Sequence, residues 1–326
     1  MLKDPEYYLK GVLDCNRLAL AKTITLIESS LPAHQEMARK LVDTLLPRTG
    51  RSVRLGITGV PGAGKSTFIE SFGLMLTKMG LKVAVLAVDP SSTVSGGSIL
   101  GDKTRMEQLS IAENAYIRPS PSGDNLGGVA RKTRETMLVC EAAGFDVILV
   151  ETVGVGQNET TVASMVDFFL VLMIAGAGDE LQGIKKGVLE LADALVINKA
   201  DGDNVERAKL AQKQYEGALH LLKPLYQNWS PPVLTCSSLE ATGLSDVWET
   251  VLDYKKRLTA TGEMGKKRKK QALDWMKFMV EEGLREWFYL NPHVAETLPD
   301  VEARVEGGLT SPTVAAIELL AYINSN

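Results

Sequence analysis

The chain has 326 residues, 45% of them hydrophobic, with a formal net charge of -4 and three widely separated cysteines, Cys15, Cys140 and Cys236. Its length allows one large core with smaller extensions, its charge excludes an extended basic surface for nucleic acid, and its cysteine spacing argues against a disulfide framework or a CxxC metal site. Because the longest apolar run is far below the roughly 20 residues that cross a bilayer and the polar N-terminus lacks a secretion signal, we expect a cytoplasmic protein without membrane attachment.

The sequence divides into three expected regions. Residues 1–50 have the pattern of two or three helices that end at Pro47, ahead of the first core strand, and we expect an N-terminal helical extension. Residues 51–260 carry alternating strand and helix patterns and form the main domain. Residues 261–326 become helical again and form a C-terminal helical extension.

Short β-branched runs alternate with helical patterns through the main domain. The expected strands are Val53 to Thr58, Lys82 to Val88, Ala115 to Arg118, Asp146 to Val150, Phe168 to Met173, Ala194 to Ile197 and Pro232 to Thr235. The expected helices include Ser66 to Met79, Leu126 to Ala143, Val205 to Leu222 and Leu244 to Leu258. This alternation predicts an α/β fold with a mostly parallel central sheet covered on both faces.

A phosphate-loop pattern, GxxxxGK[ST], lies between the first expected strand and the first expected helix of the main domain. It consists of Gly59, Val60, Pro61, Gly62, Ala63, Gly64, Lys65 and Ser66. In such a loop, backbone N–H groups converge on the β-phosphate and the helix N-terminus adds its positive end. We expect Lys65 to reach the β- and γ-phosphates, Ser66 to bind Mg²⁺ and Thr67 to contact the α-phosphate. The flanking strand and helix disfavour the alternative of a glycine-rich turn without ligand.

Three acidic residues are candidates for the metal site. Asp89 and Glu151 end two of the expected strands, and Asp102 follows a polar, glycine-rich segment that reads as a loop able to order over nucleotide. With Ser66 and phosphate oxygens they form the predicted Mg²⁺ site. The alternatives are a helix cap for Asp102 and a simple strand-end acid for Asp89.

The stretch ETVGVGQNE, Glu151 to Glu159, is similar to the phosphate-sensing loop of a nucleotide switch, with two changes. Its carboxylate is Glu151 where Asp is usual, and Val155 follows Gly154. We expect the Gly154 N–H to reach the γ-phosphate and Glu151 to reach the metal through water. Val155 has no group to orient the attacking water, as glutamine does in Ras, and Gln157 is a candidate only after rearrangement, with a structural role as its alternative.

A guanine-reading pattern, NKxD, follows the strand Ala194 to Ile197 as Asn198, Lys199, Ala200 and Asp201. The Asp201 carboxylate can accept hydrogen bonds from guanine N1–H and the exocyclic amine, whereas adenine would leave that charge unpaired. We expect Lys199 to lie over the base and Asn198 to tie this loop to the phosphate loop. Backbone N–H groups near guanine O6 are expected from Ser237, Ser238 and Leu239.

The C-terminal region has an amphipathic stretch from Gln271 to Leu290. Its apolar face comprises Trp275, Phe278, Met279, Leu284, Trp287 and Phe288. Packing on the main domain and self-association would both bury this face, and the pattern leaves both open. The basic cluster Lys266 to Lys270 (KKRKK) precedes it, and we interpret this cluster as a solvated helix start in preference to a contact site for acidic surfaces.

Six motifs occur in the order GVPGAGKS, DPSS, GDKTRM, ETVGVGQNE, GAGDELQGIKKG and NKAD. With them, nearly the whole chain resembles the MeaB/MMAA family of P-loop GTPases, also called ArgK or lysine/arginine/ornithine transport ATPases. The resemblance implies a homodimer that binds GTP, GDP and Mg²⁺ and chaperones methylmalonyl-CoA mutase, gating adenosylcobalamin delivery and protecting that enzyme.

The resemblance also implies roles for single residues. Lys65, Ser66, Asp89, Asp102 and Glu151 would organise phosphates and Mg²⁺, while Asn198, Lys199 and Asp201 would read guanine. The additional switch of the family matches Gly176 to Lys186, where Asp179, Gln182 and Lys185 would move with nucleotide state and partner, Lys185 being a candidate to complete the chemistry. The C-terminal helices of the family form its dimerisation arm, which favours self-association of Gln271 to Leu290.

Two other functions are compatible with a phosphate loop. A protein that energises basic amino-acid transport would need a membrane or periplasmic partner, and the sequence contains no anchor for one. A small-molecule kinase would need an acceptor pocket with a general base and would tolerate ATP, which the NKxD pattern disfavours. We therefore expect a slow GTPase that acts through a protein client.

Overall fold

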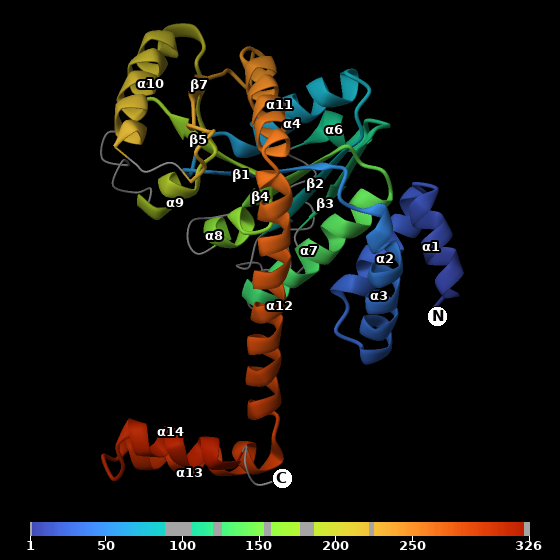
Figure 1. The fold of residues 1–326 in the computed structure, drawn as a ribbon, viewed down its shortest axis with the longest axis vertical. Helices are drawn as coiled ribbons and strands as arrows, with labels where there is room; N and C mark the ends of the chain where they lie inside the picture. Colours follow the sequence, from blue (N-terminus) through green and yellow to red (C-terminus); the bar gives the residue numbers. More distant parts are fainter. Residues whose placement is uncertain are drawn as a thin grey trace. The chain divides into compact units, whose positions relative to one another are not determined.

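The computed structural model describes residues 2–88, 106–119, 126–152, 158–176, 186–221 and 225–322 (Figure 1). The chain forms two compact units, Met1–Lys267 and Arg268–Asn326. The three-region division expected from the sequence stays a prediction. In the described part of the chain, no helix is both long enough and apolar enough to cross a membrane.

A seven-stranded sheet forms the centre of the first unit, in the order β3-β2-β4-β1-β5-β6-β7. The strands are β1 Val53–Gly59, β2 Val83–Val88, β3 Ala115–Arg118, β4 Val147–Thr152, β5 Phe168–Ile174, β6 Ala194–Asn198 and β7 Val233–Thr235. All pairings between them are parallel. The predicted α/β fold is confirmed, and each expected strand is present with small shifts at its ends.

The central strands of this sheet are almost continuously apolar because helices cover both faces. Strands β2, β4 and β6 are buried along their whole length. In the parallel register Ile57 pairs with Glu151 and Gly59 with Leu172, while Ile174 pairs with Asn198. The carboxyl ends of β1, β4, β5 and β6 therefore meet at one edge of the sheet, where parallel α/β folds bind ligands.

Helices lie on both faces of the sheet, with α4 and α11 on one side and α7 and α8 on the other (Figure 1). Their bounds are α4 Lys65–Lys78, α6 Glu107–Ile111, α7 Leu126–Ala142, α8 Asn158–Ala163, α9 Lys186–Leu191, η4 Gly202–Asn204, α10 Val205–His220 and α11 Leu244–Ala260. The four helices predicted for the main domain correspond to α4, α7, α10 and α11. Their buried faces complete the core that holds the strand ends in place.

The N-terminal extension consists of α1 Pro5–Leu13, α2 Arg17–Glu28, α3 Pro32–Leu45 and the short η1 Leu46–Arg48. It is fastened to edge strand β3, because Arg118 Nε donates to Glu28 Oε1 at 2.9 Å. At the other end of α2, Arg17 donates to the carbonyl of Ala112 at 3.0 Å. These contacts cover an edge strand that would otherwise present unpaired backbone groups.

The second unit contains most of α12 Glu263–Tyr289, followed by α13 Pro292–Glu306 and α14 Pro312–Ala321. Helices α13 and α14 are joined by an ion pair between Arg304 Nη2 and Glu318 Oε1 at 2.6 Å. Part of the predicted apolar face on α12 is exposed in the single chain, as Leu284 is 58% and Trp287 is 48% exposed.

The basic cluster at the start of α12 differs from the expected solvated helix start. The Lys267 side chain is only 13% exposed, and its Nζ donates to the Asp167 carbonyl at 2.6 Å and to Tyr254 Oη at 3.0 Å. The ammonium also lies 5.5 Å from the ring centres of Tyr226 and Tyr254. A buried carbonyl, a hydroxyl and two aromatic faces replace the water that a solvated lysine would keep.

Candidate functional site

The phosphate loop leaves β1 at Gly59 and enters α4 at Lys65. Gly62 and Gly64 have φ angles of 77° and 84°, in the left-handed region that favours glycine. A Cβ at Gly59 would lie only 2.3 Å from the Leu172 carbonyl oxygen, so a side chain does not fit there. The loop is therefore a tight turn that ends at a helix N-terminus, which is suited to binding an anion.

Other residues of the loop hold this turn. Ala63 N donates to the Val60 carbonyl at 3.1 Å, and both residues are buried. Phe68 N donates to the Gly64 carbonyl at 2.8 Å and begins the helical hydrogen bonding. Pro61 and Thr67 are exposed. The outer side of the loop is therefore accessible, while Val60 and Ala63 are buried beneath it.

The Lys65 ammonium and the Glu151 carboxylate lie at the beginning of α4. Lys65 Nζ donates to the Gly59 carbonyl at 3.0 Å. Burial lowers the pKa of Lys65 from its usual value, and attraction to Glu151 and Glu159 opposes this effect. Ser66 Oγ lies 3.4 Å from Glu151 Oε1, and Glu151 is 3% exposed. The register of β4 against β1 thus brings Glu151 beside the phosphate loop.

Asn198 connects the base-reading loop to two other loops. Its Nδ2 donates to the Ala63 carbonyl at 2.8 Å, which is the expected tie to the phosphate loop. Its Oδ1 accepts from Ser238 N at 3.1 Å and from Ser238 Oγ at 2.7 Å. The Cys236 thiol donates to the same oxygen at 3.4 Å. One buried amide therefore fixes three loops relative to one another.

Lys199 and Asp201 are each held by a neighbouring side chain. Lys199 has a φ of 59°, and Asn204 Nδ2 donates to its carbonyl at 2.7 Å. Lys199 Cε lies 3.8 Å from the position that a Cβ on Gly64 would occupy, so its stem passes beside the phosphate loop. Ser237 Oγ donates to Asp201 Oδ2. The carboxylate is thereby oriented before any base is bound.

The backbone N–H groups expected near guanine O6 are partly engaged. Ser237 N donates to the Thr242 carbonyl at 3.0 Å, and Ser238 N donates to Asn198. Leu239 is 82% exposed, and its N–H donates to no atom within the described residues. Of the three predicted donors, Leu239 is the one whose N–H is not already used by this fold.

Sequence reasoning missed two residues that support the loops. Ser71 Oγ donates to the Ser238 carbonyl at 2.6 Å from helix α4, while Asn204 makes the contact described above. Ser71 belongs to no motif, so only the fold identifies it. The position of Asn204 beside the NKxD loop was visible in the sequence, but its hydrogen-bond partner was not.

Five predicted site residues, Asp89, Asp102, Gly154, Gln157 and Lys185, lie outside the described residues. Asp179 and Gln182 of the expected additional switch lie outside them too. Their roles, like the nucleotide-binding roles of the described residues, stay predictions.

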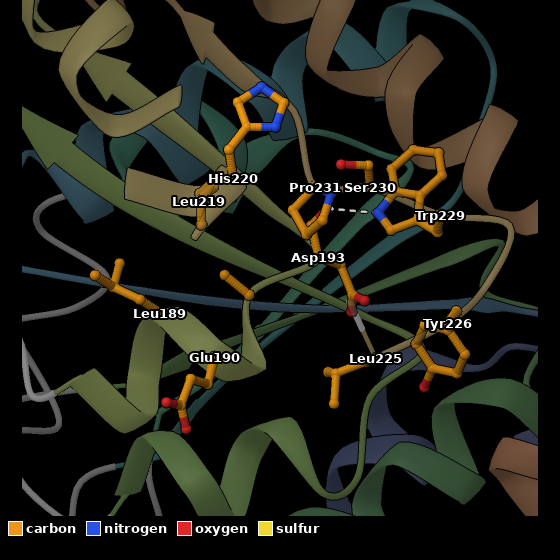
Figure 2. Close-up of a pocket in the computed structure, with 11 residues that line it drawn as sticks. Leu189, Glu190, Asp193, Leu219, His220, Leu225, Tyr226, Trp229, Ser230 and Pro231 are labelled. Carbon is orange, nitrogen blue, oxygen red and sulfur yellow. Dashed lines mark hydrogen bonds between the residues drawn. The ribbon is translucent and has the colours of Figure 1, made fainter. Parts of the chain in front are cut away.

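A cavity of about 110 Å³ lies away from these loops, at the amino-terminal edge of the sheet (Figure 2). Asp193, which directly precedes β6, and Pro231, which lies shortly before β7, are among its lining residues. The dashed line in Figure 2 is the hydrogen bond from Trp229 Nε1 to the Asp193 carbonyl at 2.8 Å. None of the predicted site residues lines this cavity.

The chain is similar to one protein family, to proteins of known sequence and to a solved structure. Residues 20–293 match the family model described as methylmalonyl Co-A mutase-associated GTPase MeaB. GTPase ArgK of Escherichia coli (strain K12) is 50% identical over 95% of this chain and 93% of its own. The methylmalonic aciduria type A homolog, mitochondrial, of Mus musculus is 45% identical over 97% of this chain and 78% of its own. A crystal structure of an LAO/AO transport system kinase matches with a TM-score of 0.80 and 41% identity over 99% of both chains.

Proposed function

The chain belongs to the MeaB family of methylmalonyl-CoA mutase-associated GTPases, and from this premise we propose that it is a cytoplasmic guanine-nucleotide switch that hydrolyses GTP and acts on methylmalonyl-CoA mutase. The observation that carries the proposal is the Asn198 bridge between Ala63 and Ser238. It holds the predicted phosphate loop and the predicted base-reading loop together at the same edge of the sheet, which supports the binding of one nucleotide by both loops.

In the proposed reaction, GTP and water give GDP and inorganic phosphate. The bond from the γ-phosphorus to the β,γ-bridging oxygen breaks, a bond to the water oxygen forms, and a water proton is released. Lys65 stabilises charge on the β- and γ-phosphates, while loop N–H groups hold the β-phosphate. Intrinsic turnover is slow because Val155 carries no group to orient water, and the client or the segment containing Lys185 completes the site.

Mg²⁺ fits the oxygen donors beside the phosphate loop. The Ser66 hydroxyl and the Glu151 carboxylate lie 3.4 Å apart, and both are hard ligands of the kind that Mg²⁺ prefers. Asp89 and Asp102 are proposed to complete the set. When bound, Mg²⁺ would neutralise charge that develops on the phosphates.

Guanine selectivity is proposed to come from Asp201. Ser237 already orients one carboxylate oxygen of Asp201, and guanine supplies two donors to this group, whereas adenine supplies none in that position. The Leu239 N–H is the proposed donor to guanine O6. An adenine nucleotide would supply no donor to the Asp201 carboxylate and would leave Ser237 as its partner, which lowers the affinity several-fold at least.

The proposed partners are the mutase and a second copy of this chain. The family description names methylmalonyl Co-A mutase, and we propose that nucleotide turnover gates adenosylcobalamin delivery to the mutase and protects it. The half-exposed apolar side chains of α12, among them Leu284 and Trp287, support a homodimer formed through this helix, because such surface is stabilised when it is covered.

The proposal is tested by measuring GTP and ATP turnover of the purified chain in Mg²⁺, with and without methylmalonyl-CoA mutase, and by gel filtration in each nucleotide state. We expect slow GTP hydrolysis that the mutase accelerates, no comparable ATP hydrolysis, and a complex that depends on nucleotide. Unchanged rates and no complex in any state would remove the client role. Equal use of ATP and GTP would instead favour a kinase or a transport-energising protein.

A further inference from the structure

A hydroxyl on helix α4 contacts the loop that is expected to read guanine O6. Ser71 Oγ donates to the Ser238 carbonyl at 2.6 Å, across 167 residues of the chain. A hydroxyl inside a helix commonly donates to a carbonyl of its own helix, three or four residues earlier, as Thr77 of α4 does to the Leu74 carbonyl at 2.9 Å. The Ser71 hydroxyl instead joins α4 to the loop between β7 and α11.

Helix α4 also packs against α11, the helix that follows this loop (Figure 1). The rings of Phe72 and Trp248, both buried, lie 6.2 Å apart at 71°. Ser245, the second residue of α11, donates its hydroxyl to Met75 Sδ at 3.8 Å. Met75 lies three residues after Phe72 and four after Ser71, so all three share one face of α4. The packing of two helices therefore sets the position of the Ser71 hydroxyl.

The backbone of Ser238 is held on both sides of its Cα. Its N–H and its hydroxyl donate to Asn198 Oδ1 at 3.1 Å and 2.7 Å, and its carbonyl accepts from Ser71. Ser238 is only 3% exposed, so water has little access to these groups. Asn198 consequently fixes the peptide that precedes Ser238, and Ser71 fixes the peptide that follows it.

The peptide that follows Ser238 carries the Leu239 N–H, which is the proposed donor to guanine O6. This peptide is trans, so its C=O and N–H groups point in opposite directions within one plane. Because the Ser238 carbonyl points at α4, the Leu239 N–H points away from α4. Leu239 is 82% exposed, which leaves this N–H open to a ligand. The hydrogen bond to the carbonyl also polarises the peptide and makes its N–H a stronger donor.

We propose that Ser71 is a specificity-determining residue for guanine: by holding the Ser238 carbonyl, it directs the Leu239 N–H at O6 of the bound base. Ser71 is a positioning residue, because its hydroxyl contacts the loop and not the nucleotide. The inference rests on the proposed guanine-nucleotide function and extends it to the recognition of one base atom. Adenine carries an amine where guanine has O6, so an N–H fixed in this direction opposes adenine independently of Asp201.

The test compares GTP with 6-thio-GTP, in which sulfur, a weaker acceptor, replaces O6 while N1–H and the exocyclic amine remain. The Kd of each is measured at neutral pH by competition with a fluorescent GTP analogue, in the wild-type chain and in Ser71→Ala. We expect the wild type to bind GTP about tenfold more tightly than 6-thio-GTP. In Ser71→Ala, the affinity for GTP should fall about fivefold and that for 6-thio-GTP less than about twofold, so the preference for GTP shrinks.

Two further variants and one further nucleotide separate this role from general support of the loop. Ser71→Thr keeps the hydroxyl and is expected to retain most of the preference for GTP over 6-thio-GTP. Thr77→Ala removes a hydroxyl that bonds to its own helix and is expected to change neither Kd. Inosine triphosphate lacks only the exocyclic amine that Asp201 is proposed to read. The ratio of GTP to inosine triphosphate affinities should therefore be the same in Ser71→Ala as in the wild type.

The inference is overturned if the affinities of Ser71→Ala for GTP and 6-thio-GTP change equally or not at all, since an equal loss is what general support of the loop would cause. It is also overturned if the wild type does not distinguish the two nucleotides. In both cases, a wild type that binds GTP in preference to ATP leaves the proposed function standing. A wild type that binds neither GTP nor ATP, or binds both equally, removes the proposed function, and the inference falls with it.

Discussion

Lys267 Nζ lies 3.5 Å from Asp193 Oδ2, and the two side chains are only 13% and 3% exposed. Asp193 directly precedes β6 and also accepts from Phe169 N at 2.9 Å. Lys267 lies near the start of α12, where it also bonds to Asp167 and Tyr254. The pair therefore joins the first turns of α12 to the amino-terminal edge of the sheet.

We expect Lys267→Met to lower the free energy of unfolding by about 3 kcal/mol, because it leaves the Asp193 carboxylate buried without its cation. The measurement is urea unfolding followed by circular dichroism. Lys266→Met is the matched control. Lys266 is next in the chain but exposed, so its side chain is expected to contribute no more than about 0.5 kcal/mol to the free energy of unfolding. Similar losses in the two variants would contradict the contact.

The same pair predicts a dependence of stability on pH. Burial alone lowers the pKa of Lys267, but attraction to Asp193, Tyr226 and Asp167 outweighs it and raises the pKa above its usual 10.5. Because the pKa is higher in the folded chain than in the unfolded chain, this stabilisation is fully present below pH 10.5 and is lost as pH rises through the folded value. The unfolding free energy of the wild type should therefore fall more steeply with pH above 10.5 than that of Lys267→Met, and parallel curves would exclude this contribution.

The sequence predicted most of the fold because its signals are local. Buried parallel strands are short β-branched runs, so β3 was placed at its observed bounds and the others nearly so. Lys267 could not be predicted, because a run of basic residues ordinarily indicates a solvated surface. Its partner Asp193 lies 74 residues away in the chain, and only the folded sheet brings the two together.

For the candidate site, the sequence predicted the positions of the loops but not the contacts between them. Motif spacing identified the phosphate loop and NKxD, and the strand ends placed both at one edge. The contacts within the site depend on long-range packing, as in the bond from Asn198 to Ala63, which spans 135 residues. The hydrogen bond from Ser238 N to Asn198 could not be predicted either, because it depends on how closely the loops containing these two residues approach each other.

Asp201→Asn is expected to shift nucleotide preference from GTP toward xanthosine triphosphate by about 100-fold, since the amide offers a donor to the carbonyl that replaces the guanine amine. Competition binding against the fluorescent GTP analogue measures the ratio of the two affinities. Ser237→Ala is the companion variant, because it removes only the hydroxyl that orients Asp201. Ser237→Ala should weaken GTP binding without shifting the preference toward xanthosine triphosphate. An unchanged preference in Asp201→Asn would remove Asp201 from the base pocket.

Gly56→Ala tests the packing of α8 on β1. The added Cβ would lie 3.0 Å from Val162 Cγ1 in α8 and 2.9 Å from Val166 Cγ2, which follows that helix. Overpacking of this kind costs about 1–3 kcal/mol in the free energy of unfolding. The control is Gly217→Ala on α10, where nothing lies within 4 Å of the added atom and stability should be unchanged or slightly higher. Equal stability in both variants would contradict the close approach of α8.

The three cysteines are expected to differ in reactivity, which tests the link between Cys236 and Asn198. Burial raises the pKa of Cys236 to about 12 and also raises that of Cys140, so neither forms an appreciable amount of thiolate at about pH 8. Iodoacetamide should therefore modify Cys15, which is partly exposed, in the native chain and all three cysteines after denaturation, as read by mass spectrometry of the peptides. Modification of native Cys236 as fast as Cys15 would mean that its thiol is not held against Asn198, and the three-loop connection would then lack one of its bonds.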